Sequence, residues 1–166
     1  ALREAGADPA VWRYMPVDAS VDDGAFHAWI ETALADPGRV PFAILREGVP
    51  VGSSSYLSLV PEHRRLEIGY TWVGRDCWGS GVNTEAKLLL LEHAFERCGA
   101  LRVEFKTDAS NERSRAALAG LPASFEGVHR RHMLVQGGRR RDSAWYSVID
   151  EDWPAVRARL EEKLGR

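Results

Sequence analysis

The sequence predicts a single α+β domain, built around a mixed, mostly antiparallel, twisted sheet that is flanked by helices. Three observations support this fold class. The 166 residues fit one domain, which can bury a core without disulfides or metals. The expected elements run as helices, an antiparallel meander, and then strand, helix, strand, helix and hairpin. No repeat, low-complexity tract or linker divides residues 1–166, so one domain is the economical interpretation.

Composition narrows the class of protein. Hydrophobic residues make up 45% and charged residues 28% of the chain, and the net charge of -2 gives no general attraction to nucleic acid or anionic membranes. The two cysteines, Cys77 and Cys98, form neither a CxxC pair nor a disulfide framework, which suits a reducing cytoplasm. The longest apolar run, 88–91, is far too short to span a bilayer. We therefore expect a cytoplasmic protein without nucleic-acid or membrane partners.

The N-terminal region is expected to be helical. The chain opens at Ala1 as if already inside a helix, so we expect an incomplete N-terminus. Pro9 suits the first turn of a short helix over 10–14. Ser20 is expected to cap a helix from 21 to about 35, in a capping box with Asp in place of Glu. The face expected to be buried carries Phe26, Ile30 and Leu34.

Strand patterns follow. Segments 41–46 and 51–59 flank Glu47-Gly48-Val49-Pro50, which indicates a hairpin. A strand over 66–73 is expected to place Ile68, Tyr70 and Trp72 on one face.

A loop that contains two glycines then opens the most strongly patterned helix. This helix is expected from Val82 to about Cys98, ended by Gly99, with a leucine run that should pack against the sheet. The remaining elements are a strand over 102–107, a short helix over 111–118, a hairpin of strands 123–135 and 139–149, and a last helix over 152–164.

The loop and first helical turn, residues 78–86, carry the clearest chemical signal. Gly79 and Gly81 permit positive φ and let a bulky ligand approach the main chain. The free N–H groups and dipole of the helix N-terminus favour phosphate. No Lys-Ser/Thr pair and no third glycine follows, so neither a Walker A loop nor a Rossmann fingerprint is present. In isolation, the two glycines would indicate only a tight turn.

The loop is not isolated, because other segments of the chain also match a known pattern. Glu67-Ile68-Gly69-Tyr70, the loop 78–86 with Thr84-Glu85-Ala86, and Asn111-Glu112-Arg113-Ser114 resemble the GNAT acetyltransferases, most closely the RimJ/RimL-like group that acetylates ribosomal protein N-termini. Phe125-Glu126-Gly127-Val128 and the late Asp142 and Tyr146 are also similar to that branch. The resemblance covers roughly residues 40–150. The matching motifs identify the cofactor specifically but give little information about the acceptor.

The resemblance implies acetyl-CoA (coenzyme A) as the cofactor and a sheet splayed where the cofactor enters, with a first strand missing from this chain. Trp72 and Val73 would bond the pantetheine arm through the main chain, and the N–H of Val73 would suit the oxyanion. Asn111 would hold the pantetheine amide. The pyrophosphate would be bound by Gly79, Ser80, Gly81, Val82, Asn83 and Thr84.

The chain also departs from the family pattern. Asp76 stands where relatives carry Gln or Arg, and Leu118 where many carry a tyrosine that acts as general acid. Leu121-Pro122-Ala123 replaces a Leu-Gly-Phe/Ala signature. Met133 takes the position of a glutamate found in the ribosomal-protein enzymes, which puts their direct transfer in doubt.

Two residues are candidates for catalysis. Ser114 would protonate the leaving thiolate, although a helix-surface serine is an equally ordinary explanation. Glu67 would act as base through a water, although a surface or paired carboxylate is a simpler explanation. His129 and His132 titrate in a useful range, but three residues apart on a strand they should face opposite sides.

The other candidate groups carry weaker signals. Five arginines near the expected hairpin turn form a basic run, usually a solvated face, with attraction of an acidic acceptor peptide or a ribose phosphate as the alternative. They are Arg130, Arg131, Arg139, Arg140 and Arg141. His27, His63 and His93 show no metal-ligand spacing, and no metal site is expected.

The sequence therefore predicts an N-acetyltransferase that uses direct attack in a ternary complex. Its acceptor would be a primary amine, either a protein N-terminus or a small molecule, and the resemblance leaves a homodimer open. Two alternatives remain: a noncatalytic, regulatory CoA-binding module of the same fold, and a binder of another phosphate ligand such as a nucleotide.

Overall fold

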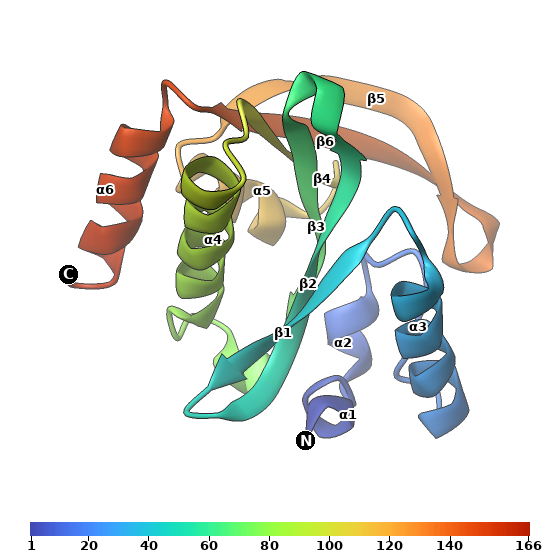
Figure 1. The fold of residues 1–166 in the computed structure, drawn as a ribbon. Coiled ribbons are helices and arrows are strands. Elements are labelled where there is room, and N and C mark those ends of the chain that lie inside the picture. The colour runs from blue at the N-terminus through green and yellow to red at the C-terminus, as the bar shows by residue number, and fades with distance from the viewer.

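The computed structural model describes residues 1–166 and contains one six-stranded sheet with helices on both faces (Figure 1). The strand order is β1-β2-β3-β4-β6-β5, and only β3 and β4 pair in parallel. The predicted α+β, mostly antiparallel sheet is therefore confirmed. The strands are β1 (Val40–Arg46), β2 (Val49–Val60), β3 (Arg65–Val73), β4 (Arg102–Asp108), β5 (Ser124–Val135) and β6 (Arg139–Ile149).

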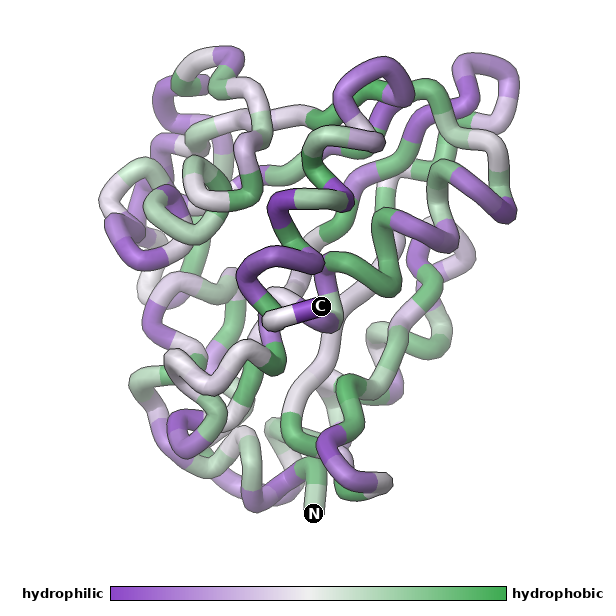
Figure 2. The backbone as a smooth tube through the Cα atoms, turned by 90° about the vertical axis from the view of Figure 1, so that its left-hand side faces the viewer, coloured by the Kyte–Doolittle hydropathy of each residue, from purple (hydrophilic) through white to green (hydrophobic).

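The helices form a layer on each face of the sheet (Figure 1). One layer holds α1 (Leu2–Ala5), α2 (Pro9–Trp12) and α3 (Asp23–Ala35), and the other holds α4 (Val82–Glu92), α5 (Glu112–Ala119) and α6 (Trp153–Lys163). A π turn over His93–Arg97 extends α4, and Gly99 follows with φ 63°. No helix has the length and apolar character needed to cross a membrane. Seen from the side of α6, hydrophilic turns lie at the outer edges of the molecule (Figure 2).

Each layer has its own hydrophobic core. The larger core packs α4 and α6 against the sheet through residues such as Leu91, Val103 and Leu160. On the other face, Trp12, Phe26, Trp29 and Trp72 form an aromatic cluster with ring centroids 5.1 to 6.4 Å apart. Burying such large rings contributes strongly to folding, so this cluster fixes α2 and α3 on the sheet.

The third helix differs from the sequence-based prediction. It begins at Asp23 with Asp22 as the N-cap, whose carboxylate accepts from the N–H of Ala25 at 2.7 Å. Ser20 does not cap it, because its hydroxyl and N–H both donate to Asp18. The buried face is also different: Leu34 is exposed, and the core residues are Phe26, Trp29 and Ala33.

A bulge in β3 overturns the predicted single face of Ile68, Tyr70 and Trp72. The pairing with β2 shifts between Ser53 and Ser55, and Tyr70 has φ 48°. Such a bulge reverses the alternation of the side chains that follow. Ile68 therefore packs in the core under α4, whereas Trp72 packs in the aromatic cluster on the opposite face.

The sheet opens immediately after the point where its two parallel strands begin. β3 and β4 pair only over Arg65–Glu67 and Arg102–Glu104, and their later residues have no pairing with each other. This divergence separates the C-terminal ends of the two strands. It confirms the splayed sheet that the family resemblance implies and places a cavity at its opening.

Candidate active site

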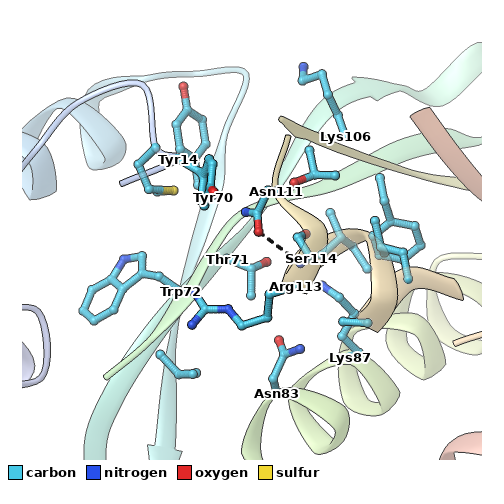
Figure 3. A pocket seen from close by; sticks show the side chains of 18 of the residues that line it. Tyr14, Tyr70, Thr71, Trp72, Asn83, Lys87, Lys106, Asn111, Arg113 and Ser114 are labelled. Atoms are coloured by element: carbon cyan, nitrogen blue, oxygen red, sulfur yellow. Dashed lines mark hydrogen bonds between the residues drawn. The ribbon is translucent and has the colours of Figure 1, made fainter. Parts of the chain in front are cut away.

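A cavity of about 770 Å³ occupies the splay between β3 and β4. Asn83 and Lys87 of α4 lie at one end, Tyr14 and Lys106 lie toward the other, and Ser114 lies between them (Figure 3). We call the first the α4 end, with residues 79–87, and the second the Glu67 end. The Glu67 end is formed by Tyr14, Glu67, Tyr70, Lys106, Met133 and Arg141.

The α4 end is built mainly from backbone. Gly79 and Gly81 have φ of 75° and 87°, and Gly81 is the N-cap of α4. The N–H groups of Gly79, Gly81, Val82, Asn83 and Thr84 donate to no acceptor in the protein. Ser80 differs, because its N–H and hydroxyl both donate to the carbonyl oxygen of Cys77, at 3.3 and 2.7 Å. A row of free donors at a helix N-terminus suits phosphate.

Two basic side chains add positive charge at this end. Lys87 lies one turn into α4, with its ammonium 5.0 Å from the centroid of the Phe105 ring and no carboxylate partner. Burial lowers the pKa of Lys87 to about 8. The guanidinium of Arg113 stacks on the Trp78 ring at 3.5 Å, and burial lowers its pKa. Both residues line the cavity, so an anion at the α4 end would meet these cations as well as the backbone donors.

The start of α5 lines the middle of the cavity. Asn111 is the N-cap of α5, and its carbonyl oxygen accepts from the N–H of Ser114 at 3.1 Å (Figure 3). That bond leaves the side-chain NH₂ of Asn111 free to donate. The hydroxyl of Ser114 has no partner in the protein. Trp72 and Val73 line the cavity from the end of β3, so the splay, Asn111 and Ser114 surround the same space.

Glu67 is the most buried charged residue at the other end, with 2% of its surface exposed. Its carboxylate lies 3.2 Å from the ammonium of Lys106. Burial raises the pKa of Glu67, and the Lys106 charge opposes that rise only in part. A Cβ at Gly69 would lie 2.9 Å from a carboxylate oxygen of Glu67 and 2.7 Å from Leu57. The glycine of the Glu67-Ile68-Gly69-Tyr70 segment therefore makes room for the carboxylate.

The histidines are placed differently from their sequence-based prediction. Arg131 has φ 50° and the β5–β6 pairing shifts between His129 and Met133. This bulge brings His129 and His132 onto the same side, with ring centroids 5.6 Å apart and both rings against Trp145. Neither histidine lines the cavity. No group of three His, Cys, Asp or Glu side chains has metal-binding geometry.

Sequence reasoning missed several residues that line the cavity. Tyr14 comes from the segment after α2, which Gln136 of the β5–β6 turn holds by donating to the carbonyl oxygens of Trp12 and Met15, each at 2.8 Å. Lys87 and Lys106 carry no distinguishing signal of their own in the sequence. The spacing from Gly81 could have pointed to Lys87, because it lies on α4 less than two turns beyond the loop. No local signal could have identified Tyr14.

The fold and cavity define an acyltransferase-like domain, and comparison with known proteins gives its family. Residues 1–121 match the family model described as an acetyltransferase (GNAT) domain. The chain therefore belongs to the GNAT acetyltransferase family.

Individual proteins show the same relationship. A structure of a candidate acetyltransferase from T. thermophilus is 44% identical, with a TM-score of 0.91 over 99% of this chain and 90% of that chain. The uncharacterized N-acetyltransferase p20 of Bacillus licheniformis is 25% identical over 152 residues, which are 89% of this chain and 84% of that protein. Mycobacterium smegmatis RimJ in complex with CoA-disulfide shares the fold, with 24% identity and a TM-score of 0.78 over 100% of this chain and 87% of RimJ.

Proposed function

We propose that this protein transfers an acetyl group from acetyl-CoA to a primary amine, by direct attack in a ternary complex. One observation carries the proposal: the unpartnered N–H groups of the α4 end and the buried carboxylate of Glu67 open onto one cavity. The cavity can therefore bind an anionic ligand at the α4 end and holds a proton-accepting group at the Glu67 end. The acceptor is a protein N-terminus, as the RimJ/RimL-like resemblance implies, or a small amine.

The residues of the α4 end fit coenzyme A. A Cβ at Gly79 would meet nothing within 4 Å, and one at Gly81 only Leu164 at 3.7 Å, so the loop is open to a bulky group. The N–H groups of Gly79, Gly81, Val82, Asn83 and Thr84 would hold the pyrophosphate, with Ser80 closing the loop on Cys77. Further along the cavity, Trp72, Val73 and Asn111 would hold the pantetheine arm.

The chemistry divides between two side chains and one main-chain group. Bound acetyl-CoA supplies an acetyl thioester. Glu67 accepts a proton from the incoming amine through a water, which its raised pKa favours. The main-chain N–H of Val73 donates to the thioester oxygen. Ser114 donates a proton to the departing sulfur. Overall, the C–N bond forms, the C–S bond breaks, and the new S–H bond accounts for the proton that the amine loses. Water carries the proton from Glu67 back to Ser114, which restores both side chains.

Two measurements test this function. CoA should raise the unfolding temperature of the protein whereas ATP should not, because a ligand that binds only the folded state stabilises it. A panel of peptides and small amines should release thiol from acetyl-CoA. Absence of a shift at saturating CoA would contradict the proposal, and a shift without thiol release from any amine would favour a noncatalytic CoA-binding module.

A further inference from the structure

Arg141 is a buried cation at the Glu67 end of the cavity that forms no ion pair. It lies on β6 opposite Met133, lines the cavity and is 5% exposed. Its Nε atom is buried without a partner, and the one hydrogen bond of its guanidinium runs from Nη1 to the carbonyl oxygen of Tyr14 at 3.5 Å, the outer limit for such a bond. Arginine keeps its charge in proteins, so the guanidinium cannot relieve the unfavourable burial of its charge by losing its proton.

The two carboxylates that act on the charge of Arg141, Asp108 and Glu67, are already paired with other cations. Asp108 pairs with Arg139 at 2.8 Å and also accepts from Ser110. Glu67 pairs with Lys106 at 3.2 Å. Neither carboxylate lies within 4.0 Å of the Arg141 guanidinium. The Glu67 end therefore holds one cation more than its carboxylates neutralise.

The neighbouring arginine shows that this burial is not a property of the whole basic run. Arg140 alternates to the opposite face of β6 and is exposed, as a solvated surface residue should be. Arg141, by contrast, is enclosed in the cavity with hydrogen-bond donors left over. An unpaired buried charge is strongly unfavourable, which points to a ligand that supplies the missing anion.

We propose that Arg141 binds a carboxylate of the acceptor, so that the preferred substrates are amines that also carry a carboxylate. This inference rests on the proposed function and specifies its substrate class. A guanidinium binds a carboxylate through two parallel, charge-assisted hydrogen bonds, which would also orient the acceptor. The carboxylate takes no part in bond making; it positions the amine near Glu67. The carboxylate comes from a free amino acid or from an acidic side chain near a peptide N-terminus.

Matched acid and amide acceptors test the proposal. We would measure kcat/KM for L-alanine and L-methionine against their C-terminal amides, and for alanyl-aspartate amide against alanyl-asparagine amide. The first comparison tests an α-carboxylate and the second an acidic side chain. Amidation lowers the basicity of an α-amine and so favours the amide, which makes a preference for the acid harder to obtain by chance. We expect at least one acid to exceed its amide by about tenfold or more.

Three variants test whether Arg141 causes the preference for the acid. Arg141→Gln should bring the acid-to-amide ratio close to one, and Arg141→Lys should leave an intermediate ratio because it keeps the charge but not the fork. Arg140→Gln removes the same charge from the adjacent exposed position and should keep the wild-type ratio. Calorimetric CoA affinity should be equal in all four proteins, which shows that each is folded.

The outcomes separate this inference from the proposed function. Equal rates for acids and amides, a preference that persists in Arg141→Gln, or acetylation of neutral amines only would each overturn the carboxylate assignment while acetyl transfer stands. If the wild type neither binds CoA nor releases thiol with any acceptor, the proposed function fails, and the carboxylate assignment fails with it.

Discussion

The two ends of the cavity present different kinds of group, backbone at one end and side chains at the other. The α4 end presents backbone N–H groups from a helix N-terminus, and its loop depends on glycines with positive φ. The Glu67 end presents charged side chains from three strands, β3, β4 and β6, beneath a segment that follows α2. Backbone donors do not depend on which side chains surround them, so the α4 end suits a ligand common to a whole family. Side chains vary freely, so the Glu67 end is where specificity can change.

The largest effect should come from Glu67, because the chemistry depends on it. Glu67→Gln keeps the shape but removes the proton acceptor, and we expect kcat to fall by about 10² to 10⁴-fold with CoA affinity unchanged. The measurement is steady-state kinetics with calorimetry. Glu104→Gln is the matched control, since Glu104 is paired directly opposite Glu67, is buried, and does not line the cavity. If both variants lose activity equally, Glu67 has a structural role only.

A second change should distinguish loss of ligand binding at the α4 end from the loss of stability that any strained turn would cause. Gly81→Ala forces a Cβ into a left-handed conformation, which costs about 1 to 2 kcal/mol or displaces the loop N–H groups. We expect CoA affinity to fall by about tenfold as those donors move. Gly48→Ala is the control, because Gly48 has φ 80° in the β1–β2 turn, outside the cavity. It should lose similar stability in thermal unfolding but keep its CoA affinity, and a matching loss of affinity in both would contradict this account.

A third change tests the Glu67 end without touching a charge. In Gly69→Ala the new Cβ would lie 2.9 Å from a carboxylate oxygen of Glu67, too close for contact. The carboxylate must shift, and we expect kcat to fall by roughly tenfold, since small misplacements of catalytic groups lower the rate strongly. CoA affinity should be unchanged by calorimetry. Activity equal to the wild type would show that the position of Glu67 is not critical.

The last effect is on stability rather than on rate or affinity: Lys87 should make the stability of the protein depend on pH. Its pKa is about 8 in the folded protein against an ordinary 10.5, so the unfolded chain binds more protons between those values and stability rises with pH there. The unfavourable burial of the ammonium is full below about pH 8. Lys87→Met should therefore be more stable than the wild type at pH 7, by about 1 to 3 kcal/mol, and this advantage should shrink as the pH approaches 10.5. Urea unfolding across the range measures it, and a constant difference would contradict the assignment.

The sequence predicts the two ends unequally, for physical reasons. Glycines before a helix are a local signal, so Gly79, Gly81 and the start of α4 could be located from the sequence. The strands and most helix limits follow from local periodicity in the same way. The bulges at Tyr70 and Arg131 could not be predicted, because a non-glycine residue with positive φ leaves no local pattern.

The side chains at the Glu67 end depend on those bulges and on pairing between distant strands. Arg141 looked like one of five similar arginines, and only the register of β6 with β4 and β5 shows that it is buried. Glu67 is a candidate from the sequence because its strand leads to the cofactor loop, but its pairing with Lys106, 39 residues away, is seen only in the structure.

The most direct test of a shared cavity is a crystal structure of the protein with CoA bound. We expect the pyrophosphate to contact the N–H groups of Gly81 to Thr84, and the sulfur to lie in the splay between β3 and β4, near Ser114. A pyrophosphate bound away from the start of α4, or a sulfur outside the splay, would contradict this expectation.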